Sequence, residues 1–263
     1  MSKNRVPHDV GVRCPLFDIL RVFVLNLLFW PLFFLHTLVG IPVMASLVAT
    51  PAPFRSHRRN MRAFRLMITR YGQLVLSSMA PFVRIFCEQP AEPLPQPCIY
   101  ICNHRSSSDP FLMAKLPGEI VQVVNVWPFR LPILGWFAKW SGYLSVREMP
   151  FNVFSKIAAH RLEQGVCIAG FPEGTRSGEG PMGPFHSALF RVALNTGVPI
   201  VPVCISGNER IPPKGSWGLN PGRIQIRVLA PVQADTYREW SPFAFKIRIR
   251  DLIQNELKKM EAG

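Results

Sequence analysis

The chain has 263 residues, 48% of them hydrophobic, so it can hold one full-sized domain with an appendage and a substantial core. Its formal net charge of +14 and its pI of about 10.2 favour polyanionic partners: nucleic acid, an anionic membrane or phosphorylated substrates. No basic run is interleaved with aromatics in the way that stacks on nucleic-acid bases, which argues against nucleic acid as a partner.

Residues 22–49 read VFVLNLLFWPLFFLHTLVGIPVMASLVA and contain no Asp, Glu, Lys or Arg. The segment exceeds the roughly 20 residues that span a bilayer core. It is too long for a signal peptide and lacks a small-residue cleavage site. Pro31 and the group Gly40-Ile41-Pro42 are expected to break its helix. Because basic residues flank it on both sides, we expect a hairpin that dips into one leaflet, with a tilted single span as the alternative.

The next segment, residues 56–79, mixes arginines with apolar residues and predicts a basic helix with an apolar side. Residues 19–87 include eight arginines and no Asp or Glu. Such a helix suits the surface of an anionic membrane, and packing against the main domain is the alternative. The Pro-rich stretch 88–97 reads as a linker. It separates N-terminal membrane-associated helices at 1–87 from a globular domain at 98–263.

From residue 98 onward, short apolar runs alternate with helix-like stretches. This alternation predicts an α/β domain with a largely buried, mixed central sheet flanked by helices. The expected strands lie at 98–102, 120–126, 142–146, 166–170, 200–205 and 223–229. The expected helices lie at 110–116, 130–140, 151–164, 185–196 and 242–260. In such a sheet, function gathers in the loops beyond the strand ends.

The loop after the first predicted strand, NHRSSSDP, places His104 five residues before Asp109. The two side chains can meet if Asp109 begins the following helix, and Asp109-Pro110 is a good helix start. Asp109 would then bind one imidazole nitrogen and leave the other as a base for an incoming hydroxyl. A turn histidine beside a capping aspartate is the alternative interpretation.

The chain contains no GxSxG nucleophile elbow, so a hydroxyl activated by His104 would belong to the substrate. Direct acyl transfer from a thioester is the natural reaction of such a pair. The three serines at 106–108 are therefore expected to be loop and capping residues. No Cys/His cluster has zinc-like spacing, and we expect neither a metal nor another cofactor.

A second loop, FPEGTRSGEGPMGP at 171–184, is Gly-rich and leads into a predicted helix. Glycines permit close approach to the backbone, while Thr175, Arg176 and backbone N–H groups are suited to holding a phosphate. The loop is therefore a candidate phosphate site, with a plain surface loop as the alternative.

Four blocks of the sequence, in order, resemble the glycerolipid acyltransferase family typified by bacterial 1-acylglycerol-3-phosphate acyltransferase. They are NHRSSSD (103–109), GYLSVR (142–147), FPEGTRS (171–177) and VPIVPV (198–203). The resemblance covers about residues 98–205. It implies that His104 is the general base and Asp109 its partner. It also implies that the acceptor's phosphate is bound by Arg147, Gly174, Thr175 and Arg176.

The resemblance further implies that Glu173 holds its loop or orients a substrate group, and that Pro199 and Pro202 lie in a block associated with substrate placement. The acyl donor would be acyl-CoA or acyl carrier protein. The acceptor would be a lysophospholipid, above all 1-acylglycerol 3-phosphate, which would yield phosphatidic acid. The N-terminal helices would hold the protein on an anionic membrane, at the cytoplasmic face of the inner membrane.

In one place the sequence departs from the family pattern. Members often carry a Lys-x-Gly element after the third block, whereas GPMGPFHSALF (180–190) has no lysine, and Arg191 is the nearest replacement. This leaves open an acyltransferase for another lysolipid or for glycerol 3-phosphate. A non-catalytic membrane protein that binds lipid is a more remote alternative.

Overall fold

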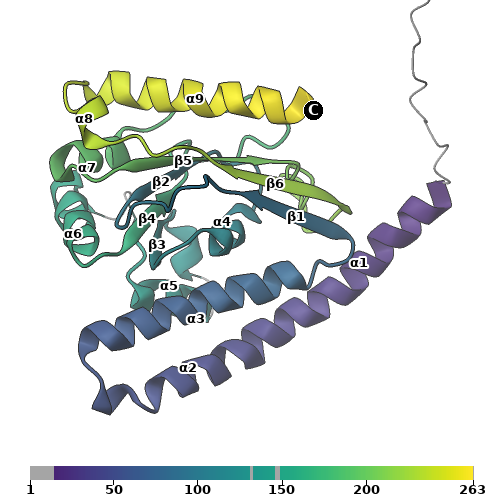
Figure 1. Ribbon diagram of the computed structural model, residues 1–263. Coiled ribbons are helices and arrows are strands. Elements are labelled where there is room, and N and C mark those ends of the chain that lie inside the picture. Colours follow the sequence, from purple (N-terminus) through teal and green to yellow (C-terminus); the bar gives the residue numbers. More distant parts are fainter. Residues whose placement is uncertain (1–14, 131–132, 146–148, 263) are drawn as a thin grey trace, which may run out of the picture.

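The computed structural model describes residues 15–130, 133–145 and 149–262, and within them a six-stranded sheet lies between two helical layers (Figure 1). The strands are β1 (Val83–Glu88), β2 (Ile99–Cys102), β3 (Ile120–Val123), β4 (Cys167–Gly170), β5 (Ile200–Ser206) and β6 (Gly222–Val228). Their spatial order is β1-β6-β5-β2-β4-β3. Only the β5–β6 pair is antiparallel among these strands, so the predicted mixed α/β sheet is confirmed.

Two hydrophobic cores, one on each face of the sheet, follow from the alternation of side chains along each strand. In β2, Ile99 and Ile101 belong to one core, while Tyr100 and Cys102 belong to the other. The helices of the globular part are α4 (Asp109–Leu112), α5 (Leu134–Ser141), α6 (Phe151–Glu163), α7 (Ala188–Thr196), α8 (Ala234–Tyr237) and α9 (Pro242–Ala262). Short helical turns η3 (Met113–Lys115) and η4 (Trp127–Arg130) precede β3 and α5.

Two of the strand predictions need correction. Within the described part of 142–146, Leu144 forms only an isolated bridge with Val123. Conversely, β1 was not predicted, although it pairs in parallel with β6 at the edge of the sheet. Its exposed Arg84 and Phe86 alternate with buried or half-buried residues, and this weak pattern directly follows the apolar N-terminal segment. The predicted boundary between residues 87 and 88 falls inside β1, and residues 89–98 connect β1 to β2.

The apolar N-terminal segment forms one nearly continuous helix, and the expected breaks at Pro31 and Gly40–Pro42 are wrong. Helix α1 (Pro15–Leu35) runs through Pro31, a π-helical turn η1 (His36–Gly40) follows, and α2 (Ile41–Ala49) continues. In the π turn the Ile41 N–H donates to the His36 carbonyl. Pro42 lies in the first turn of α2, where its missing N–H costs least.

A hairpin does form, but it closes after α2 rather than inside the apolar segment. The turn contains η2 (Ala52–Phe54), and α3 (His57–Ser77) runs back beside α2 (Figure 1). The Ser56 hydroxyl caps α3 by accepting from the Arg59 N–H at 3.4 Å. Residues 16–54 are long and apolar enough to cross a membrane by length and composition.

The helix α1–α2 packs on the globular part along one stripe. Leu25, Phe29, Thr37 and Ile41 are buried at spacings of about one or two helical turns. The Asn26 side chain bonds the backbone of Leu219 through both its amide and its oxygen, each at 2.8 Å. The other sides of the helix expose large apolar residues. This exposed apolar surface is the structural basis for membrane association.

Helix α3 turns its apolar side toward the protein, so it packs against the main domain, as the alternative expectation for this segment had it. Met67, Tyr71 and Val75 are buried. Arg65 is buried as well, with its Nε donating to the Ser141 carbonyl at 2.8 Å and its Nη1 paired with the Glu119 carboxylate at 2.5 Å. Arg65 therefore joins α3 to the end of α5 and to the approach to β3.

Replacing Arg65 should destabilise the fold by leaving the Glu119 carboxylate and the Ser141 carbonyl without their partner. For Arg65→Ala we expect the free energy of unfolding to fall by about 3 kcal/mol, measured by urea titration of the detergent-solubilised chain. Arg62→Ala, on the exposed side of the same helix, is the matched control and should change stability by less than about 0.5 kcal/mol. Equal effects of the two substitutions would contradict the assignment.

Candidate active site

The candidate site begins where β2 leaves the sheet. Asn103 is buried there, with its amide donating to the Ile205 carbonyl at 2.9 Å and its side-chain oxygen accepting from the Ile205 N–H at 2.7 Å. This paired contact fixes the exit of β2 against β5. The direction in which His104 leaves the sheet is therefore set by Asn103.

His104 and Asp109 are in direct contact, as their spacing predicted. The His104 Nδ1–H donates to Asp109 Oδ2 at 2.7 Å, and Asp109 begins α4 directly before Pro110. Oδ2 also accepts from the backbone N–H of Arg105 at 2.7 Å and of Ser106 at 2.8 Å. The bond at Nδ1 leaves Nε2 of the imidazole as the nitrogen that can exchange a proton.

Glu173 binds His104 to the Gly-rich loop. Its Oε1 accepts from the His104 N–H at 2.7 Å and its Oε2 from the Gly183 N–H at 2.9 Å. Burial raises the pKa of this carboxyl. The hydrogen bonds from the two backbone N–H groups lower the pKa, but by less than burial raises it. Both carboxylate oxygens accept hydrogen bonds from the protein backbone. This geometry corresponds to the loop-holding role expected for Glu173 rather than to substrate contact.

Two further contacts join the loop to the histidine. Ser177 donates to the His104 carbonyl from both its N–H, at 2.8 Å, and its hydroxyl, at 3.0 Å. The imidazole stacks on the Phe171 ring with 4.5 Å between centroids. The two loops that the sequence singled out are therefore a single site.

An apolar cavity of about 390 Å³ opens at this site and lies within the range of ligand pockets. His104, Gly174, Thr175 and Arg176 line its polar end. Side chains from α3, α4, α5 and β3 line the rest, most of them apolar. Gly174 has φ of 68°, and a side chain there would approach the His186 ring to 3.1 Å, so the loop needs glycine at this position.

The remaining predicted positions lie away from the imidazole or outside the described residues. Arg147 belongs to the segment 146–148 and lies outside them. Pro202 is inside β5, in register with Ile101, and the Pro199 carbonyl accepts from the Ile99 N–H at 2.9 Å. The Arg191 guanidinium lies over the Phe151 ring, 3.8 Å from its centroid.

The first two serines between His104 and Asp109 have different surroundings. The Ser106 hydroxyl is buried within hydrogen-bonding distance of the carbonyls of Ile211, at 3.0 Å, and Pro212, at 2.8 Å. Ser107 lines the cavity. Among the described residues, no group of three or more His, Cys, Asp or Glu side chains could hold a metal ion.

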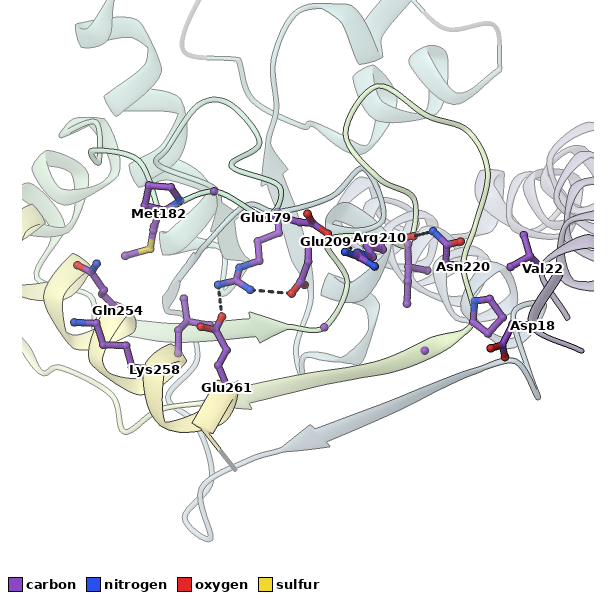
Figure 2. Close-up of a pocket in the computed structure, with 18 of the residues that line it drawn as sticks. Asp18, Val22, Glu179, Met182, Glu209, Arg210, Asn220, Gln254, Lys258 and Glu261 are labelled. Atoms are coloured by element: carbon purple, nitrogen blue, oxygen red, sulfur yellow. Dashed lines mark hydrogen bonds and ion pairs between the residues drawn. The ribbon is translucent and has the colours of Figure 1, made fainter. Parts of the chain in front are cut away.

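The sequence did not reveal two residues that support Asp109. Asn208 is fully buried, and its amide donates to Asp109 Oδ1. Arg105 pairs with Glu209 at 3.2 Å and with Glu261 at the end of α9. Figure 2 shows Glu209 and Glu261 each joined by a dashed line to one guanidinium. These residues line a second, charged cavity of about 820 Å³. The only available signal was that Asn208 and Glu209 directly follow a buried strand.

Comparison with known proteins adds to this geometry. Residues 84–206 match the family model described as acyltransferase. A chloroplastic 1-acyl-sn-glycerol-3-phosphate acyltransferase of Brassica napus is 31% identical over 202 residues, which cover 74% of this chain and 58% of that protein. The 1-acyl-sn-glycerol-3-phosphate acyltransferase alpha of Ovis aries is 32% identical over 166 residues, which cover 60% of this chain and 57% of that protein. The chain thus spans little more than half the length of these curated relatives.

A solved structure shows the same fold. The crystal structure of the 1-acyl-sn-glycerophosphate acyltransferase of Thermotoga maritima superposes with a TM-score of 0.76 at 22% identity. The match covers 94% of this chain and 98% of that one. It therefore includes the N-terminal helices as well as the sheet.

Asn208 should stabilise the fold through its bond to the buried Asp109 carboxylate. For Asn208→Ala we expect a loss of about 2 kcal/mol in the free energy of unfolding, since a hydrogen bond to a charged group is removed. Asn208→Asp keeps the side-chain shape but opposes two carboxylates, so it should destabilise at least as much at neutral pH. Urea titration measures both variants. Asn220→Ala, whose amide bonds the exposed Arg210 carbonyl, is the control, and an equal loss there would contradict this role.

Proposed function

The chain belongs, through residues 84–206, to the glycerolipid acyltransferase family, and from that premise we propose that it transfers a fatty acyl group from a thioester to a lysophospholipid hydroxyl. The proposed donor is acyl-CoA or acyl carrier protein. The proposed acceptor is 1-acylglycerol 3-phosphate, and the product is phosphatidic acid. The His104–Asp109 pair at the polar end of an apolar cavity is the observation that carries this proposal.

In the proposed reaction, His104 Nε2 takes the proton of the acceptor hydroxyl as its oxygen attacks the thioester carbonyl carbon. The carbon–sulfur bond then breaks, and the imidazolium returns the proton to the departing thiolate. Asp109 accepts from Nδ1–H throughout, so it selects the tautomer with a free Nε2 and stabilises the imidazolium. Because the protein supplies no nucleophile, no acyl-enzyme forms.

Thr175 and Arg176 are the proposed contacts for the acceptor's phosphate, together with Arg147. Thr175 is exposed and Arg176 is half-buried at the same end of the cavity as His104. An arginine can hold a phosphate in a charge-assisted, two-bond contact. Holding the phosphate would align the free hydroxyl with His104, and such positioning can contribute several orders of magnitude to the rate.

The apolar part of the cavity is the proposed place for an acyl chain. Phe137 and Ala138 of α5 contribute to its wall, as do Met67 of α3 and Met113 beyond α4. These side chains are uncharged, and so is an acyl chain. We place the protein on the cytoplasmic face of the inner membrane, since arginines flank the apolar helix on both sides.

A different acceptor for the same site is the second candidate. The loop after Ser177 lacks a lysine, and the exposed His186 ring lies next to Gly174 instead. Another lysolipid or glycerol 3-phosphate would then take the place of 1-acylglycerol 3-phosphate. A panel of acceptors assayed with one labelled acyl-CoA separates these candidates.

His104→Ala should abolish transfer, with a loss of about a thousandfold or more in kcat, because the general base is removed. Asp109→Asn should lower kcat by a similar or larger factor through the wrong imidazole tautomer. Transfer of labelled acyl groups to lysolipid by the purified, detergent-solubilised variants is the measurement, with unfolding midpoints as the control for folding. Near-normal transfer by folded His104→Ala protein would refute the mechanism.

Arg176→Gln and Thr175→Val should raise KM for an acceptor with a phosphate by about tenfold each, the effect of losing one charge-assisted contact. The KM for the acyl donor should stay within about twofold. Arg191→Gln is the matched control, because that guanidinium lies on Phe151. If Arg191→Gln and Arg176→Gln raised the acceptor KM equally, the proposed phosphate site would be wrong.

A further inference from the structure

Helix α5 has two faces with different surroundings. Phe137 and Ala138 face the protein and line the apolar cavity. Trp136 and Trp140, four residues apart and hence on one side of the helix, are each 63% exposed. Lys139 lies exposed between them in the sequence. Two large indoles exposed one helical turn apart form an apolar patch that neither core of this protein covers.

The patch is fixed to the outer side of α3. The rings of Phe64 and Phe137 stack with 5.3 Å between centroids, and the Trp140 ring lies 6.4 Å from that of Phe64. The Arg65 bond to the Ser141 carbonyl holds the end of α5 to the same helix. Helix α3 contains five arginines, at positions 58, 59, 62, 65 and 70. The indoles therefore lie next to a basic helix, which in turn packs beside α2 (Figure 1).

The charge around this patch has one sign. The sequence contains no Asp or Glu between Asp18 and Glu88, and none between Glu119 and Glu148. These two intervals include α2, α3, α5 and the part of α1 beyond Asp18. Glu119, at the edge of the second interval, is paired with Arg65. A surface that combines indoles with unopposed basic side chains is complementary to anionic lipid headgroups.

We propose that Trp136 and Trp140, with Lys139, form a second membrane contact that seats α5 in the headgroup layer of an anionic bilayer. An indole prefers this layer because its ring is apolar and its N–H needs a polar partner. Each nearby Lys or Arg adds about 1 kcal/mol of attraction to an anionic surface. The exposed apolar side of α1–α2 also suits a bilayer, and α3 packs against both α2 and α5, which favours lipid over a protein partner.

This contact would place the apolar cavity close to the bilayer. A helix is about 10 Å across, and α5 has the cavity on one side and the indoles on the other. The proposal concerns where the membrane touches the protein and does not depend on which reaction the site performs.

The test uses ¹⁹F NMR of the full chain labelled with 5-fluorotryptophan, in nanodiscs of phosphatidylcholine and phosphatidylglycerol. Single Trp→Phe variants assign the signals. A lipid with a nitroxide on its headgroup should broaden the signals of Trp136 and Trp140 beyond detection. Trp240, which packs on Phe245 in the core at the opposite face of the sheet, should keep its signal. Phe243→Trp adds a matched, exposed control, since Phe243 is 67% exposed at the start of α9.

Discs of phosphatidylcholine alone should restore part of both signals, and Lys139→Gln should do the same in anionic discs. Signals of Trp136 and Trp140 as sharp as that of the tryptophan at 243 would overturn the proposal. Broadening that follows protein concentration without the nitroxide lipid would also overturn it, because it would assign the patch to self-association. No acyl transfer is measured, so failure here leaves the proposed function standing.

Discussion

The fully buried Asp109 carboxylate is the constraint on which the site depends. A carboxylate taken out of water costs several kcal/mol unless its oxygens are satisfied. Here Oδ2 accepts from the His104 ring and from the backbone N–H groups of Arg105 and Ser106, and Oδ1 accepts from Asn208. The backbone of 104–106 must wrap around one oxygen to make these bonds. The hydrogen bonds to the buried Asp109 carboxylate thus fix both the conformation of the loop and the tautomer of His104.

The bonds around Asp109 draw three strand ends together. His104 follows β2, Glu173 follows β4 and Asn208 follows β5, and these strands are neighbours in the parallel part of the sheet. Asn103 joins the first to the third. Glu173 joins the first to the second through Oε1, while its Oε2 accepts from Gly183 in its own loop. The site thus lies beyond the carboxyl ends of the strands, as in other open α/β sheets. Its rigidity comes from backbone contacts rather than from large side chains.

The sequence predicted those parts of the molecule whose causes are local. Asp109-Pro110 is a helix start wherever it occurs, and it places the carboxylate within reach of His104. Asn208 and Arg105 escaped prediction because their partners lie far away in the chain, and neither residue type is unusual in a loop. The prediction of a helix break at Pro31 was wrong because it used a local rule and packing overrides that rule. Packing of Phe29 and its neighbours holds the helix through Pro31.

The same packing decides how the N-terminal helix can meet a membrane. Its buried stripe runs from Leu25 to Ile41, about 24 Å along the axis, and contacts the globular part over that length. A helix held in this way cannot stand upright in a core about 30 Å thick unless the domain enters with it. Lying along one leaflet is compatible with both the buried stripe and the apolar sides that remain exposed. The arginines of α3 would then meet the headgroups beside it, and the absence of acids from 19 to 87 leaves nothing there to repel them.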